Sequence, residues 1–247
     1  MRLRPTVAAL LSLALGACEG SAPVEFAHKA PAPAALERQC REVIGEPRVI
    51  EVTPRIFVAV GYDLANTILV RTPEGNVVVD VGMSPARARA TRAALLARSP
   101  GPVRAIVYTH SHIDHVGGAS AWIEPGTEVW ATDAFRDHFL KQYGMFLPAE
   151  LRRGSMQFGY HVPPELLACS ALGRRVDLEG AREAGARMPT RTFSERGTFT
   201  VGGVEFNLVE AHGETHDELF VWIPSERTIL SGDNLYEAFP NLYTIRG

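Results

Sequence analysis

Three histidines and one aspartate lie within six consecutive residues of a chain that contains only eight histidines. They belong to the stretch THSHIDHVGG, residues 109–118. In extended backbone His110 and His112 point to the same side, and Asp114 and His115 follow from the next turn. Converging imidazole and carboxylate donors suit a borderline metal such as zinc, and two neighbouring ions can share them if other segments add ligands. We therefore expect a metal centre here rather than a loop of solvated histidines.

The elements around this stretch place it at the end of a buried strand. Residues 104–109, RAIVYT, form a continuous apolar run that is typical of such a strand. Open α/β sheets bind their ligands beyond the carboxyl ends of their strands, which is where this run delivers His110. Gly117 and Gly118 then allow a short helix, through Trp122, to start close to the cluster.

The rest of the chain predicts a mixed α/β domain. Alternating apolar runs and turn signals indicate strands at residues 55–60, 67–71, 76–81 and 128–132, and hairpins at 198–209 and 219–230. Helices are expected at 85–99, after Ser84 as N-cap, and from the cap Asp133 to about Tyr143. Residues 145–197 are rich in Gly, Pro and Arg and indicate a long loop or cap.

Length and composition limit the class of protein. With 247 residues, 46% of them hydrophobic, the chain can bury one large core. The net charge of -3 is spread over both signs, without a basic stripe that would follow a nucleic-acid backbone. Nucleic acid is therefore not an expected partner.

The N-terminus has the features of an export signal. A basic start, residues 1–4, precedes an apolar run, residues 7–15, that is too short to span a bilayer. The stretch LGAC, residues 15–18, resembles a bacterial lipobox, in which Cys18 would carry the lipid anchor. An ordinary signal peptide with a chance cysteine is the alternative. We expect a signal at 1–18, a flexible tether at 19–40, one folded domain at 41–247, and a location in the cell envelope, periplasmic or otherwise extracytoplasmic.

Two further cysteines, Cys40 and Cys169, could pair in an oxidising compartment. Equally, Cys169 could be a small buried apolar side chain. The spacing of neither cysteine suggests a metal ligand.

The stretch His110 to Gly118 resembles the HxHxDH signature of the metallo-β-lactamase superfamily. This resemblance implies an αββα sandwich with a dinuclear metal site, usually two zinc ions. Asp233, in SGDN at residues 231–234, resembles the aspartate that bridges the two metals, and a simple turn aspartate is the alternative. The superfamily usually provides its third metal-binding segment as GHT before an apolar strand.

In this chain the corresponding stretch is AHGETHDEL, residues 211–219, and Glu214 falls at the place of that histidine. A glutamate there is similar to the alkylsulfatase branch. His212 and His216 remain rival ligands.

Other segments resemble the same branch, namely GYDLAN at 61–66, MQFG at 156–159 and NLYTIRG at 241–247. Pro240 stands where the branch has a histidine, and the proline usual after the glutamate is missing, so the substrate range is not fixed by this likeness. The branch also implies a later histidine ligand, a helical dimerisation region and a lipid-carrier-like domain. We therefore expect a sandwich that lacks its C-terminal elements, as a piece of a longer protein that could form a homodimer. The alternative is a second metal site completed by water or by His161.

The resemblance implies hydrolysis by metal-activated water, with Asp114 able to accept a proton. Because Glu214 adds negative charge, a cation elsewhere should bind an anionic ester substrate. Arg246 is the candidate, with donors from Asn241 and Tyr243, although packing roles for all three stay open. The expected function is cleavage of alkyl sulfate esters. The alternatives are another hydrolase of the superfamily, acting on a β-lactam, lactone, thioester or phosphoester, and a metal-binding envelope lipoprotein without turnover.

Overall fold

The computed structural model describes residues 34–157, 185–235 and the single positions 169, 174, 177, 180 and 183. The chain divides into two units, Met1–Pro31 and Ala32–Gly247, and all described residues lie in the second. Across the described part, no helix combines the length and the apolar character needed to cross a membrane.

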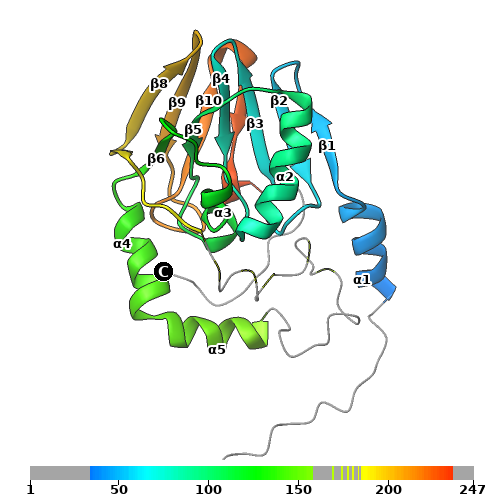
Figure 1. Cartoon of the computed structure of the whole chain (residues 1–247). Coiled ribbons are helices and arrows are strands. Elements are labelled where there is room, and N and C mark those ends of the chain that lie inside the picture. The colour runs from blue at the N-terminus through cyan, green and yellow to red at the C-terminus, as the bar shows by residue number, and fades with distance from the viewer. Residues whose placement is uncertain are drawn as a thin grey trace, which may run out of the picture. The chain divides into compact units, whose positions relative to one another are not determined.

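Two β-sheets form the centre of this unit (Figure 1). The larger sheet has seven strands in chain order, β1 (Arg48–Glu51), β2 (Ile56–Val60), β3 (Thr67–Thr72), β4 (Gly75–Val79), β5 (Val103–Val107), β6 (Glu128–Thr132) and β7 (Arg191–Phe193). Strands β1 to β4 are antiparallel, and β4 to β7 are parallel. The smaller, antiparallel sheet has the order β11 (Thr228–Leu230), β10 (Leu219–Ile223), β9 (Val204–Glu210) and β8 (Arg196–Val201).

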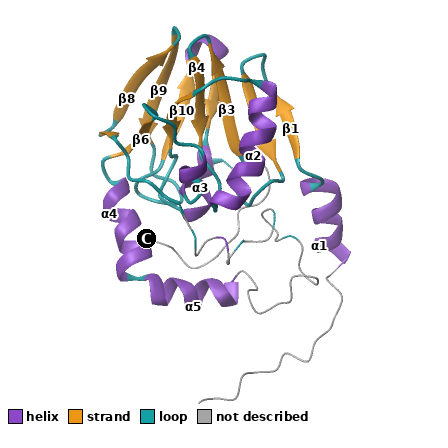
Figure 2. Cartoon of the chain, viewed as in Figure 1, coloured by secondary structure: helices purple, strands orange, loops and turns teal. Residues whose placement is uncertain are grey.

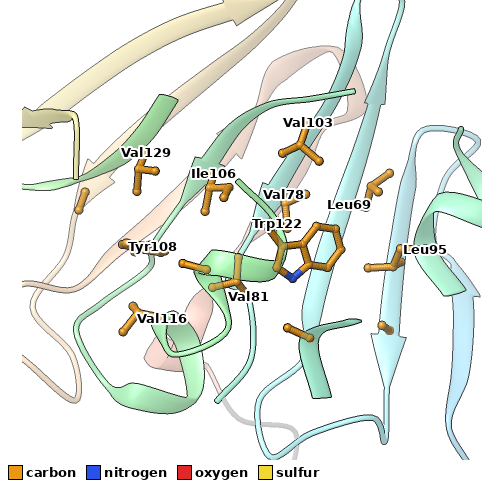
Figure 3. Packing of buried hydrophobic residues seen from close by; sticks show 14 of the residues in the cluster. Leu69, Val78, Val81, Leu95, Val103, Ile106, Tyr108, Val116, Trp122 and Val129 are labelled. Atoms are coloured by element: carbon orange, nitrogen blue, oxygen red, sulfur yellow. The ribbon is translucent and has the colours of Figure 1, made fainter. Parts of the chain in front are cut away.

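Alternation of side chains along the strands gives the larger sheet two buried faces. Val70, Val79 and Val107 face the smaller sheet, where they pack with Phe206 and Leu219. The opposite face packs against helices, and the second core there includes Leu69, Val78, Ile106, Leu95 and Trp122, as Figure 3 shows. The described residues thus form a helix layer on two packed sheets.

The helices that cover the outer face of the larger sheet are drawn in Figure 2. They are α2 (Pro85–Arg98), α3 (Ile113–Val116), the 3-10 turn η2 (Ala119–Ala121) and α4 (Phe135–Leu140). The chain then continues from α4 into η3 (Lys141–Met145) and α5 (Leu147–Gln157), none of whose described side chains belongs to this core. The remaining short elements are α1 (Ala34–Arg38), η1 (Gln39–Ile44), η5 (Pro224–Glu226) and η6 (Gly232–Asn234). Helix α2 starts as predicted, since the Ser84 hydroxyl accepts the N–H of Arg87 at 3.4 Å and Pro85 occupies the first turn.

Two details of the predicted elements are wrong. The expected loop at 145–197 contains a helix, α5, and a strand, β7. Pro148 lies in the first turn of α5, where proline is tolerated, so a proline in this segment is compatible with a helix start as well as with a loop. Asp133 does not cap α4, because the N-cap is Ala134 without a side-chain bond, and Asp133 accepts the Ser194 hydroxyl at 2.7 Å instead.

A disulfide joins Cys40 to Cys169, with their Cα atoms 5.5 Å apart and a separation of 129 positions in sequence. The pairing of these two cysteines, which was one of the two alternatives that the sequence left open, is therefore confirmed. Residues 34–40, the end of the predicted tether, are helical. Nearby, the Arg174 guanidinium donates to the carbonyls of Gly45 and Gly61, both at 2.8 Å. Two described positions of the middle segment, Cys169 and Arg174, are therefore attached to the N-terminal end of this unit.

Candidate metal centre

The histidine cluster begins where β5 ends. His112 is the N-cap residue of α3, and the N–H of His115 donates to the His112 carbonyl at 3.0 Å. Asp114 and His115 therefore lie in the first turn of a helix, whereas the sequence suggested a turn. The imidazoles of His110, His112 and His115 are all buried. Burial removes water from these nitrogens and leaves them to bind one another or an ion.

Gly117 and Gly118 explain why the helix can start so close to the sheet. A Cβ atom on Gly117 would overlap the Met83 carbonyl, and one on Gly118 would overlap the Val81 carbonyl. The loop after β4 therefore packs directly on the backbone of the glycine pair. In addition, the N–H of Val81 donates to the His115 carbonyl at 2.8 Å, which fixes the position of the helix that carries His115.

A first ligand group is formed by His110, His112 and Glu214. Nε2 of His110 lies 2.9 Å from Nδ1 of His112. Oε2 of Glu214 lies 3.5 Å from this Nδ1 and 4.0 Å from this Nε2. Ligand atoms about 2.0–2.1 Å from a tetrahedral zinc ion are about 3.3 Å apart, so the three separations agree with a shared ion.

A second ligand group is formed by His110, His115 and Asp233. Nε2 of His115 lies 3.5 Å from Oδ1 of Asp233 and 3.5 Å from Oδ2 of Asp114. Burial disfavours the charged form of His115, but the carboxylates of Asp233, Asp80 and Asp114 outweigh it and raise the pKa of this imidazole. The same surplus of negative charge favours a bound cation.

A buried polar atom without a hydrogen-bond partner also indicates a bound cation at this position. Nε2 of His115 is buried and has no hydrogen-bond partner among the described residues, although it faces two carboxylates within 3.5 Å. Buried polar atoms are rarely left without partners unless a ligand, a water or an ion completes them. The residues present therefore fit a metal ion: His110, His112 and Glu214 would hold one, and His115 and Asp233 of the second group would hold a neighbour, with Asp114 as the further ligand predicted from the sequence. Their assignment as ligands stays a prediction.

The rivals of Glu214 lie outside these groups. The side chain of His212 is 61% exposed, and its Nε2 contacts Oε1 of Glu210 at 3.2 Å. His216 is exposed, and its ring lies beside the rings of His138 and His212, with centroids 5.8 and 5.5 Å away. Among the three candidates in this segment, Glu214 is thus the one that the structure places beside His110 and His112.

Asp80 supports the site although the sequence reasoning missed it. It follows β4, and its Oδ2 lies 2.8 Å from Nδ1 of His115 and accepts the Thr109 hydroxyl at 2.8 Å. Its Oδ1 accepts the Thr109 N–H at 2.9 Å. The φ of Asp80 is 57°, a left-handed conformation that is uncommon for residues other than glycine. Asp80 therefore orients the ring so that Nε2 of His115 faces Asp114 and Asp233. An acidic residue directly after a buried apolar strand was the signal that could have revealed it.

Tyr143 and Glu218 are two further residues that the sequence reasoning missed. The Tyr143 hydroxyl accepts the N–H of Ile113 at 2.8 Å, which connects η3 to the histidine stretch. Glu218 is completely buried, and this burial raises its pKa to about 7. No sequence pattern pointed to Tyr143, whereas Glu218 lies within the segment 211–219 that was already considered for metal ligands.

Several predicted residues lie outside the described part of the chain. They are the proposed substrate residues Asn241, Tyr243 and Arg246, the neighbouring Pro240, the alternative ligand His161 and the lipid-anchor cysteine Cys18. Their roles remain predictions.

The fold and the site define the class of protein. The family model of the metallo-β-lactamase superfamily matches residues 60–244, and the chain belongs to this superfamily. The sandwich expected from the sequence is thereby confirmed as the fold class.

Within the superfamily, the chain resembles alkylsulfatases. It is 28% identical to a linear primary-alkylsulfatase of Pseudomonas sp. (strain ATCC 19151), over 72% of this chain and 35% of the relative. It is 29% identical to an (R)-specific secondary-alkylsulfatase of Pseudomonas sp., over 81% of this chain and 31% of the relative. A solved structure of a double mutant of the sec-alkyl sulfatase PisA1 superposes with a TM-score of 0.76 and 26% identity, over 89% of this chain and 37% of that one. These relatives support the alkylsulfatase-like branch, and the chain spans about a third of their length.

Proposed function

We propose that the chain carries the metal centre of a hydrolase that cleaves alkyl sulfate esters to an alcohol and sulfate. The observation that carries the proposal is the convergence of His110, His112 and Glu214, from two separate segments, at distances that fit one ion. A carboxylate in this ligand group agrees with the glutamate of the alkylsulfatase branch. The alkylsulfatase relatives support the ester class.

We propose two zinc ions, one for each ligand group. When bound, such ions supply the Lewis acidity that lowers the pKa of a water molecule and polarises an ester oxygen. The chain supplies the remaining functions. Asp114, whose side chain is 15% exposed, can accept a proton at Oδ2, and the buried imidazoles keep bulk water away from the ligand atoms.

The charge of the site bears on how an anionic substrate is bound. Glu214, Asp114 and Asp233 place three carboxylates around the histidines, so the site itself attracts a sulfate ester less strongly than an all-histidine site. We propose that Arg246 binds the sulfate group, with Asn241 and Tyr243 as further donors, because a guanidinium matches a planar pair of oxygens.

We also propose that the protein is exported to the cell envelope and anchored through a lipid on Cys18, and that the full-length protein forms a homodimer. The basic and apolar start of the chain supports the first two statements. The resemblance to the branch supports the third.

Metal analysis together with sulfate release from dodecyl sulfate tests the proposal. We expect two ions per wild-type protein, and loss of at least one ion and more than 100-fold of the rate in both His112→Ala and Glu214→Ala. His212→Ala is the matched control, since it removes an exposed imidazole from the same loop and should keep both metal and rate. Full metal and full rate in both test variants would contradict the proposal. Loss of metal in His212→Ala alone would assign the ligand to His212.

If the wild type binds metal but releases no sulfate from any alkyl sulfate, the proposed metal centre is supported and the proposed substrate class is wrong. A panel of β-lactam, lactone, thioester and phosphoester substrates then separates another hydrolase of the superfamily from a metal-binding protein without turnover.

A further inference from the structure

Glu218 combines complete burial with direct contact to a proposed metal ligand. It lies directly before β10, and its exposed fraction is 0%. Its Oε2 accepts the backbone N–H of Glu214 at 2.7 Å. The side chain thus closes the loop between residues 214 and 218, and it holds the backbone from which the Glu214 carboxylate extends.

The same carboxylate lies where two loops of the site meet. A Cβ atom added to Gly213 would overlap both Oε2 of Glu218 and Oδ1 of Asn234. Asn234 directly follows Asp233 in the second ligand group. The Glu218 carboxylate and Asn234 therefore both approach Gly213, where the loop that carries Glu214 meets the loop that carries Asp233.

The backbone of Glu218 is tied to the strand that delivers the histidines. Its carbonyl accepts the N–H of Ala211 at 2.9 Å, and the next residue, Leu219, donates its N–H to the Thr109 carbonyl at 2.9 Å. Thr109 is the neighbour of His110. The Glu218 main chain is consequently fixed relative to His110. The hydrogen bond from the Glu214 N–H to the Glu218 side chain then fixes the Glu214 backbone relative to His110 as well.

Stability alone does not explain an acidic residue here. Oε1 of Glu218 is buried without a hydrogen-bond partner among the described residues. Burying a carboxylate with incomplete hydrogen bonding is unfavourable, and an apolar residue of similar size is often more stable at such a position. The hydrogen bond to Glu214 is the feature that an apolar side chain could not replace.

We propose that Glu218 is a positioning residue, which holds the Glu214 backbone so that the Glu214 carboxylate completes the ligand group with His110 and His112. This inference rests on the proposed metal centre and adds a residue that controls its affinity for one of the two ions.

Two substitutions separate the hydrogen bond from the bulk of the side chain. Glu218→Gln keeps an oxygen that can accept the Glu214 N–H, whereas Glu218→Leu has a similar size and no acceptor. The affinities for Zn²⁺ and Co²⁺ are measured by competition with a chromophoric chelator, and the Co²⁺ absorption spectrum follows the ligand geometry. The binding step that His112→Ala abolishes identifies the ion of the first ligand group.

We expect Glu218→Leu to weaken the ion of the first ligand group by about 10- to 100-fold and to change the other less than about threefold. Glu218→Gln should restore the affinity to within about threefold of wild type. Glu210→Leu is the matched control, because the Glu210 carboxylate also accepts a backbone N–H, that of Glu195 at 2.8 Å, but outside the two ligand groups. It should leave both affinities unchanged.

Gly213→Ala tests the inference if Glu218→Leu does not fold. The added methyl group would push against Oε2 of Glu218 and Oδ1 of Asn234 while Glu218 itself remains, and it should weaken the same ion. Wild-type metal affinity in Glu218→Leu would overturn the positioning role. The same holds if Glu218→Leu lowers the affinities for both ions equally, or if Glu210→Leu lowers them as much as Glu218→Leu does. If wild type binds no metal, the proposed function fails, and this outcome is distinct from failure of the inference.

Discussion

Asp80→Asn should weaken the metal site at His115 while it preserves the local backbone. Asp80 has a φ of 57°, and asparagine is one of the few residues besides glycine that adopts this conformation readily. The amide oxygen of asparagine can still accept the Thr109 N–H, now at 2.9 Å from Oδ1. In the wild type, Nδ1 of His115 lies 2.8 Å from Oδ2 of Asp80. In the variant the amide nitrogen would take the place of Oδ2, and because it is a donor it cannot accept the N–H of the His115 ring.

The expected magnitude follows from that lost contact. A buried hydrogen bond to a charged group contributes about 1.5–3 kcal/mol. Residues that orient a metal-binding histidine typically change metal affinity by about 10- to 100-fold, which corresponds to about 1.4–2.8 kcal/mol. We therefore expect Asp80→Asn to weaken the ion at His115 by about 10- to 100-fold, and to leave the ion at His112 within about threefold.

Competition with a chelator measures both affinities, and thermal unfolding of the metal-free protein measures the structural cost. Asp80→Ala is the companion variant, because it loses the same contact and adds about 1–2 kcal/mol of backbone strain in the left-handed region. It should be less stable than Asp80→Asn but bind metal similarly. Unchanged affinity in Asp80→Asn, or an equal loss of both ions, would refute the orienting role.

Three further predictions concern stability. Replacing Cys40 and Cys169 by serine should lower the free energy of unfolding by about 2–5 kcal/mol in guanidinium titrations, since the bond closes a span of 129 residues, and a change below about 0.5 kcal/mol would contradict this. Gly117→Ala should destabilise the protein by about 1–3 kcal/mol and weaken metal binding, whereas Gly144→Ala, where a Cβ meets nothing within 4 Å, should do neither. Burial raises the pKa of Asp63 above its ordinary value of 3.8 despite the Arg87 ion pair, so the native state binds this proton more tightly than the unfolded chain. Its contribution to stability should be full below pH 3.8 and be lost as the pH rises through the native pKa, and Asp63→Asn should remove this slope from urea titrations at a series of pH values.

Residues close in sequence carried most of the prediction of the site. His110, His112, Asp114 and His115 lie within six positions, so any strand-to-helix connection at this point brings them together. Glu214 and Asp233 follow strands β9 and β11, and they were predicted from the resemblance to the superfamily's metal-binding segments, with His212 and His216 left open as rivals of Glu214.

Other features depend on contacts between distant segments. Helix α5 was missed because local Pro and Gly signals allow either a helix start or a loop. The partner of Cys40 could not be chosen because chain spacing does not fix the distance between two Cα atoms.

The sequence by itself determined which side chains can bind a metal and which periodic runs build the two sheets, because both depend on neighbours along the chain. Only the tertiary structure decided that Glu214 rather than His212 lies beside His110 and His112, that Asp80 orients His115, and that Glu218 supports the Glu214 loop. These relations arise from packing between strands that are remote in sequence, and their distances follow from the geometry of the folded core rather than from residue type.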